Sequence, residues 1–155
     1  MIDDGLFEDY HPERVLGLHI WNQLPSGFVG VNDSAVFASA DAFSLEVKGR
    51  GGHGALPHLN VDPIVAASHI ISNAQTIVSR EISPQDPGVL TFGKIQSGFA
   101  PNIIPDSVNI EGTIRAYSQD VREKIYSSLE RISKLSAESM RSTASTEIMY
   151  GAGPV

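Results

Sequence analysis

The chain has 155 residues, of which 41% are hydrophobic and 19% charged, values typical of a folded globular protein rather than a disordered one. A formal charge of −7, with no basic run to offset it, argues against nucleic acid as a partner. No apolar run approaches a membrane span, no secretory signal opens the chain, and cysteine is absent, so we expect neither a membrane partner nor disulfides and favour a cytoplasmic protein.

The first forty residues resemble the margin of a larger domain. Residues 1–8 are typical of a helix end, and residues 15–21 are typical of a strand buried on both faces of a parallel sheet. One such strand cannot make a sheet, so we assign residues 1–42 to the remnant of a catalytic α/β domain and its linker. Residues 151–155 have linker composition and are expected to lead back to that domain.

The segment after residue 42 predicts a strand and then a helix. Phe43, Leu45 and Val47 alternate with polar residues, as in a half-buried strand. Asp62 offers an N-cap carboxylate, and Pro63 fits the first helical position, where its missing N–H has no partner to lose. The apolar face of this helix is predicted to consist of Ile64, Ala67, Ser68, Ile71, Ala74 and Val78.

The second half of this segment predicts two more strands, a helix and a last strand. Strands are expected from residue 89 to about 96 and again after a loop over residues 97–105, and Ser118 can cap the helix. The second of these strands would bury Val108, Ile110, Gly112, Ile114 and Ala116 and turn Arg115 to its other face. The helix would bury Val121, Ile125, Leu129, Ile132 and Leu135.

With a final strand over residues 143–150, the order becomes β-α-β-β-α-β. This order predicts an α+β, ferredoxin-like domain over residues 43–150, with a four-stranded antiparallel sheet and two helices on one face. The connection between its first strand and first helix, residues 48–58, contains four glycines and two histidines. A loop that only reverses the chain would be shorter and would not need imidazoles, so we treat this loop as a candidate site.

Five sequence elements, in this order, carry a resemblance to a known family. They are Gly17-Leu18-His19, the glycine-rich loop with His53 and Pro57-His58, Asp62-Pro63, the run from Pro101 to Asp106, and the run from Gly112 to Ala116. Together they resemble the two-metal amidohydrolases that include aminoacylases, hippurate hydrolases, indoleacetyl-amino-acid hydrolases and glutamate-releasing carboxypeptidases. The resemblance implies that residues 43–150 form an inserted lid domain that pairs with its twin in a homodimer.

The resemblance gives two histidines a role. His19 matches a metal ligand of the family, and a neutral imidazole suits zinc or manganese; from its position alone it would be a structural histidine. His53 matches a histidine that reaches the partner subunit's active site and hydrogen-bonds the oxygen that becomes negative in the tetrahedral intermediate. From the residues alone, a solvated loop histidine is an equal reading of His53, although its flanking glycines permit close approach to a ligand.

Two further residues gain a role from the resemblance. Asn102 matches an asparagine that binds the substrate or the developing oxyanion, and Arg115 matches an arginine that holds the substrate's carboxylate. A guanidinium on a strand is suited to that task because it binds a carboxylate through two parallel hydrogen bonds. The plain alternatives are a turn asparagine for Asn102 and a cross-strand charge pair of Arg115 with Glu111 or Glu46.

The family's other metal ligands and its paired glutamates have no counterpart in the chain, which contains no Glu-Glu pair. We therefore expect at most a partial site for the two divalent ions (Zn, Mn or Co), and a chain that is inactive alone. In the full-length protein it would serve a metal-dependent amidohydrolase acting on N-acyl or N-aryl amino acids with a free carboxylate, such as hippurate. The alternative is a freestanding ferredoxin-like module that binds amino acids or proteins without catalysis.

Overall fold

The computed structural model describes residues 4–8 and 10–155, which divide into two units, residues 1–31 and 32–155. In the described part of the first unit, residues 4–8 form turns, with the Glu8 N–H donating to Gly5 O at 2.9 Å. The predicted helix end lies partly outside the described residues. The predicted buried strand over residues 15–21 is wrong: none of the strands in the described chain pairs with it, and Leu16 and Leu18 are at least 90% exposed.

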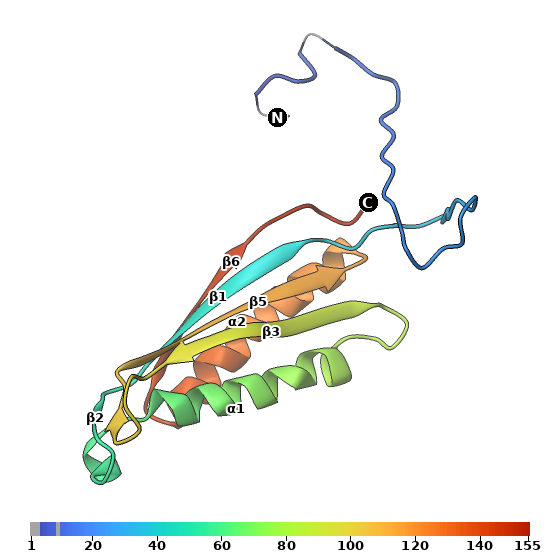
Figure 1. The fold of residues 1–155 in the computed structure, drawn as a ribbon. Coiled ribbons are helices and arrows are strands. Elements are labelled where there is room, and N and C mark those ends of the chain that lie inside the picture. The colour runs from blue at the N-terminus through green and yellow to red at the C-terminus, as the bar shows by residue number, and fades with distance from the viewer. Residues whose placement is uncertain (1–3, 9) are drawn as a thin grey trace. The chain divides into compact units, whose positions relative to one another are not determined.

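The second unit contains an antiparallel four-stranded sheet with both long helices on one of its faces (Figure 1). The strand order is β3-β5-β1-β6, and β2 pairs with β4 in a separate two-residue ladder. The strands are β1 (Asp41–Lys48), β2 (Gly52–His53), β3 (Gly88–Ser97), β4 (Ile103–Ile104), β5 (Ser107–Ala116) and β6 (Thr143–Met149). The helices are η1 (Pro57–Leu59), α1 (Pro63–Thr76), the π-helical η2 (Ile77–Glu81) and α2 (Gln119–Ser139). The ferredoxin-like prediction is confirmed.

The centre of the sheet has the predicted buried faces. Phe43, Leu45 and Val47 on β1 are fully buried and lie opposite β5, whose Val108, Ile110, Ile114 and Ala116 are also fully buried. Gly112 stands opposite Phe43, and a Cβ at Gly112 would collide with the Phe43 ring and with Thr91 O. Alternation therefore predicts these two strands well, because every second side chain of each strand packs into the core and the residues between them face the other side of the sheet.

Helix α1 begins where the sequence predicts and buries a different face. Asp62 Oδ1 accepts hydrogen bonds from the N–H groups of Ile64 at 2.9 Å and Val65 at 3.3 Å. Of the predicted apolar face only Ala67 and Ala74 are buried; the face in contact with the core is Pro63, Ala66, Ala67, Ile70, Ala74 and Ile77. Small alanines let the helix approach the sheet closely, and Ile64 and Val65 are left 46% exposed.

Helix α2 follows its prediction except at one position. Ser118 Oγ accepts from the Val121 N–H at 3.3 Å, and Val121, Ile125, Leu129 and Ile132 are buried. Leu135 is 54% exposed, so its assignment to the core is wrong. The buried face of α2 instead continues at Ser136, which packs against α1 and accepts a hydrogen bond from Asn73 Nδ2 at 3.0 Å. Across the described chain, no helix is both long and apolar enough to cross a bilayer.

A buried ion pair joins the start of β1 to α2 and to the segment after β6. The Asp41 side chain is fully buried; Arg122 Nε donates to Oδ2 at 2.9 Å and Arg122 Nη2 to Oδ1 at 2.5 Å. The Gly151 N–H adds a third bond to Oδ1 at 2.9 Å. Burial alone raises the pKa of the Asp41 carboxyl, but hydrogen bonds from Arg122, Tyr126 and Gly151 outweigh it and hold this pKa well below its usual range.

We predict that Asp41→Asn lowers the free energy of unfolding at pH 7 by about 3–5 kcal/mol, because it leaves the buried Arg122 guanidinium without its counter-charge. A folded-state pKa below the unfolded value of about 3.9 contributes stability that is complete above that pH and is lost as the pH falls through the lower folded value. The difference in free energy of unfolding between wild type and Asp41→Asn, measured by urea unfolding, should therefore become smaller below about pH 4.

The matched control is Glu111→Gln, which breaks the exposed 2.7 Å pair with Lys94. An exposed ion pair contributes little to stability, so this change should lower the free energy of unfolding by less than about 1 kcal/mol, both at pH 7 and below about pH 4. Equal losses for the two variants at pH 7 would contradict the role given to the Asp41–Arg122 pair.

Candidate functional site

The β2–β4 ladder brings two of the predicted site residues together. His53 pairs with Ile103, and the Gly54 N–H donates to Asn102 O at 2.9 Å. A Cβ at Gly54 would lie 3.0 Å from that same carbonyl oxygen, so a side chain at this position would push against the Asn102 main chain. His53 and Asn102, far apart in the sequence, are thus neighbours across one short ladder.

The His53 ring is arranged as a hydrogen-bond donor. The Ala55 N–H donates to His53 Nδ1 at 3.0 Å, so Nδ1 acts as the acceptor and the ring proton is assigned to Nε2. The side chain is exposed, which leaves Nε2–H to meet a ligand. A donor fixed in this way is suited to an oxygen that gains negative charge during a reaction.

The loop beneath His53 is held by an aspartate whose role the sequence did not indicate. Asp106 Oδ1 accepts from the Gly51 N–H at 2.9 Å, and Asp106 O accepts from the Gly49 N–H at 2.8 Å. A Cβ at Gly51 would come within 2.5 Å of Ile104 O, so the glycine is required by close packing of two main chains. Only the tertiary pairing shows why an acidic residue follows the proline of this motif.

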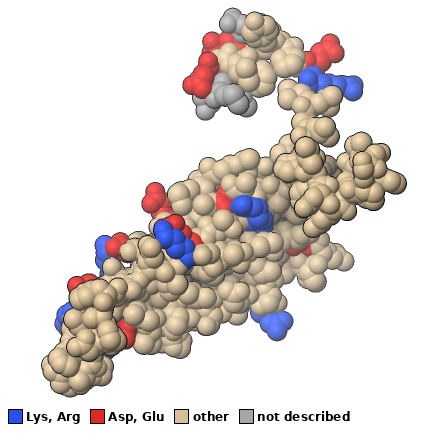
Figure 2. Space-filling model, in the orientation of Figure 1, with Lys and Arg blue, Asp and Glu red and all other residues tan. Residues whose placement is uncertain are grey.

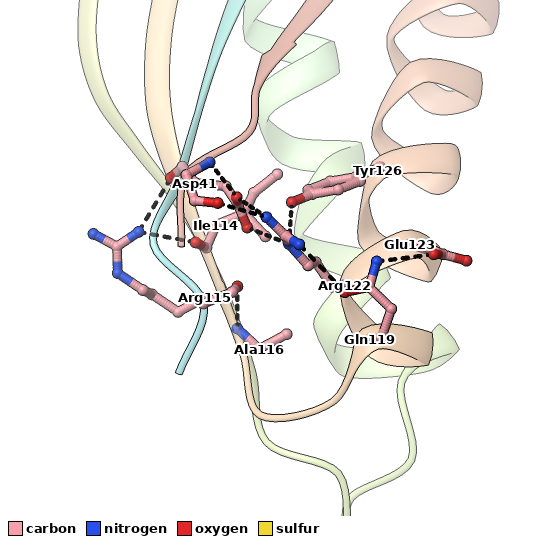
Figure 3. A network of polar contacts seen from close by, with 10 residues as sticks. Asp41, Ile114, Arg115, Ala116, Gln119, Arg122, Glu123 and Tyr126 are labelled. Carbon is pink, nitrogen blue, oxygen red and sulfur yellow. Dashed lines mark hydrogen bonds and ion pairs between the residues drawn. The ribbon is translucent and has the colours of Figure 1, made fainter. Parts of the chain in front are cut away.

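Arg115 lies at the other end of β5, beside Asp41 (Figure 3). Its Nη1 donates to Asp41 O at 3.1 Å and to Ile114 O at 2.9 Å, and the rest of the guanidinium points away from these carbonyls. The alternative of a charge pair with Glu111 or Glu46 is wrong, because those carboxylates pair with lysines at 2.7 and 3.0 Å. The two arginines in this view, Arg115 and Arg122, lie on opposite sides of Asp41.

One chain does not bring Arg115 to the His53–Asn102 pair. The pair lies beside the start of β5, next to Asp106, and Arg115 lies near its end. Eight residue steps along a strand separate Ser107 from Arg115, roughly 26 Å. That distance is too great for one small substrate to contact both groups of the same chain.

Residues 39–140 match the family model of the M20 peptidase dimerisation domain. The chain belongs to this family. The match confirms the amidohydrolase resemblance and the assignment of this segment as the domain through which such enzymes pair.

Two curated deacetylases and one solved peptidase structure are similar to this chain. The N-acetyl-L-cysteine deacetylase of Bacillus subtilis (strain 168) is 42% identical over 125 residues, which are 81% of this chain and 30% of that enzyme. The N-acetyldiaminopimelate deacetylase of Leuconostoc mesenteroides is 37% identical over 132 residues, 84% of this chain and 34% of that enzyme. The solved Bacillus subtilis protein YXEP, a dinuclear metal-binding M20 peptidase, superposes with a TM-score of 0.64 at 26% identity, over 81% of this chain and 30% of its own. The chain thus spans about a third of these proteins.

This M20 dimerisation domain does not hold a complete metal site in its described residues. No group of three or more His, Asp, Glu or Cys side chains there is placed to bind an ion. His19 is exposed, its Nδ1 lies 2.6 Å from Ile20 O, and its ring meets Trp21 edge-on at 5.9 Å. One imidazole fits as a single ligand only, so the metal role of His19 remains a prediction.

Proposed function

We propose that this chain is the lid and dimerisation domain of a metal-dependent amidohydrolase that cleaves N-acyl amino acids with a free carboxylate. The observation that carries the proposal is that His53, whose Nδ1 accepts from the Ala55 N–H, pairs with Ile103, while the next residue, Gly54, donates to Asn102 O. The relatives whose names specify N-acetyl amino acids support this substrate class. The chain contains no Glu-Glu pair to match the paired glutamates of the family, and we expect it to be inactive by itself.

In this proposal, His53 and Asn102 donate hydrogen bonds to the amide oxygen as it becomes negative. Arg115 binds the substrate's carboxylate through the part of its guanidinium that faces away from Asp41. The two divalent ions of the family, zinc, manganese or cobalt, would activate water, with His19 as one ligand. All other chemistry lies on residues outside this chain.

The separation of the two ends of β5 supports a site made from two copies. His53 and Asn102 of one chain would enter the site of the partner, whereas Arg115 would serve the site of its own chain. This arrangement agrees with the role that the family resemblance assigns to the loop histidine, and it makes the homodimer a requirement for turnover.

The surface proposed for the homodimer is the outer face of α1 together with the β3 edge. No Asp, Glu, Lys or Arg occurs from Pro63 to Ser79, and the surface over α1 is almost entirely tan in Figure 2. Strand β3 is an edge strand on the side of the sheet where α1 packs, and its Lys94 is neutralised by Glu111. Interface cores are poor in charge, and an edge strand offers unpaired main-chain groups to a second copy.

The opposite side of the domain is less suited to pairing. Its helix α2 carries charged residues along the exposed face, namely Glu123, Lys124, Glu130, Arg131, Lys134 and Glu138, and the β6 edge carries Glu147. Desolvating these charges would oppose association.

The role of His53 can be tested in a chimera in which residues 39–150, through the end of β6, replace the matching segment of the Bacillus subtilis N-acetyl-L-cysteine deacetylase. There His53→Ala should lower kcat about 10²–10³-fold, the usual loss when one oxyanion donor is removed. His58→Ala, an exposed histidine of the same loop, is the control and should leave turnover unchanged. Equal kcat for the two variants would contradict the catalytic role of His53.

The role of Arg115 is tested in the same chimera with two substrates, N-acetylcysteine and its carboxamide. Arg115→Ala should raise KM about 10- to 100-fold for the free acid, as expected for loss of a charge-assisted pair, and leave the carboxamide within about 3-fold. Arg80→Ala, an exposed arginine near the end of α1, serves as the control. A loss of the same size for both substrates would show that Arg115 does not bind the carboxylate.

For the dimer, Val65→Glu on the outer face of α1 should weaken self-association of this 155-residue chain by about 30-fold or more, measured by sedimentation equilibrium. Ser127→Glu places the same charge on the exposed face of α2 and should have no effect. If only the Ser127 variant dissociates, the interface lies on α2 and β6 instead.

A further inference from the structure

The loop that carries His53 closes on itself at its neck. Arg50 and Val61 exchange both main-chain hydrogen bonds, at 2.8 and 2.9 Å, so residues 51–60 leave and return at one point. The Arg50 guanidinium also donates to Leu59 O at 2.8 Å. A compact loop whose ends meet is ordered by its own interior side chains. A buried side chain inside this loop is therefore in a position to stabilise the segment that carries His53.

That interior side chain is Asn60, which is only 7% exposed. Its Nδ2 donates to Leu56 O at 3.0 Å and to His53 O at 3.4 Å. Gly52 lies so close that a Cβ there would collide with the Asn60 amide. One buried amide thus contacts the residue before His53, the carbonyl of His53 itself and the turn that follows it.

Arg141 connects this loop to the end of α2. It is the one non-glycine residue of the described chain with a left-handed backbone, at φ 64°. The Arg141 N–H donates to Glu138 O and the Ser142 N–H to Ala137 O, both at 3.0 Å, which is the helix end that glycine usually forms. The Arg141 Nη2 donates to Asn60 O at 3.3 Å.

We propose that Asn60 and Arg141 are positioning residues for His53. Asn60 fixes the loop from within, and Arg141 ties it to α2, which is why a strained residue stands where glycine would be favoured. The inference rests on the proposed role of His53, and neither residue touches the substrate. An oxyanion donor must be placed before charge develops, and a displacement of about 1 Å can lower a rate on the order of 100-fold.

Arg141→Gly separates positioning from folding, because the two effects have opposite signs. Glycine adopts the left-handed conformation without strain, so the urea midpoint of the 155-residue chain should stay equal or rise. The amides of Leu56 and Asn60, which bond within the loop, should exchange with solvent about 10-fold faster. Arg141→Lys retains a cationic donor and should restore slow exchange. Unchanged loop exchange in Arg141→Gly would overturn the role of Arg141.

Asn60 is tested against a matched asparagine, Asn73, whose amide bonds Ser136 between the two helices. Asn60→Ala should speed exchange across residues 51–60 by about 10- to 100-fold, and Asn73→Ala should leave the loop unchanged. Should Asn60→Ala unfold the domain, Asn60→Asp keeps the volume, removes the donor and is measured in the same way. Equal loop exchange in the Asn60 and Asn73 variants would overturn the role of Asn60.

Turnover in the deacetylase chimera then separates the positioning role of Asn60 and Arg141 from the catalytic role of His53. Arg141→Gly and Asn60→Asp should lower kcat about 10- to 100-fold with KM within about 3-fold, because an oxyanion donor acts in the transition state. If His53→Ala lowers kcat and these variants do not, positioning by Asn60 and Arg141 is overturned and the role of His53 stands. If His53→Ala also has no effect, the proposed function itself fails.

Discussion

The buried pair between Asp41 and Arg122 is the interaction on which the rest of this domain depends. Its carboxylate receives the guanidinium from α2 and the Gly151 N–H from the segment after β6, and so ties the first strand, the second helix and the end of the domain at one point. Such a pair is stable only because its hydrogen bonds are nearly complete, since burial alone opposes both charges. The edge-to-face contact of Tyr126 with Tyr150 covers the same cluster.

The same aspartate contributes to both the fold and the proposed chemistry. Its carboxylate faces the helices, whereas its carbonyl holds Arg115 on the other side of the strand (Figure 3). At the far end of β5, Asp106 anchors the loop of His53 through two main-chain N–H groups. The two ends proposed to be functional are therefore joined by one strand, and the length of this strand prevents both ends of one chain from reaching a single small substrate.

Local patterns predicted the elements of this fold well and their faces less well. Alternation in β1 and β5 and the caps at Asp62 and Ser118 are local properties, and all of them are confirmed. The buried face of α1 differs from the prediction because it combines three alanines, which let the helix approach the sheet, with Ile70 and Ile77, which fill the core. Leu135 is exposed for a related reason, since the spacing that meets α1 continues to Ser136. Among the described residues, no strand pairs with the segment 15–21 that was predicted to be a strand.

The sequence by itself determined the family, the α+β order and the candidate residues His53, Asn102 and Arg115, because motifs, caps and periodicities are written in neighbouring positions. Only the tertiary structure decided which of them meet. A two-residue ladder unites His53 with Asn102, and the length of β5 keeps Arg115 apart. Asn60, Asp106 and Arg141 have no sequence signature. Each of them forms hydrogen bonds with main-chain atoms that come near it only when the loop over residues 51–60 has folded.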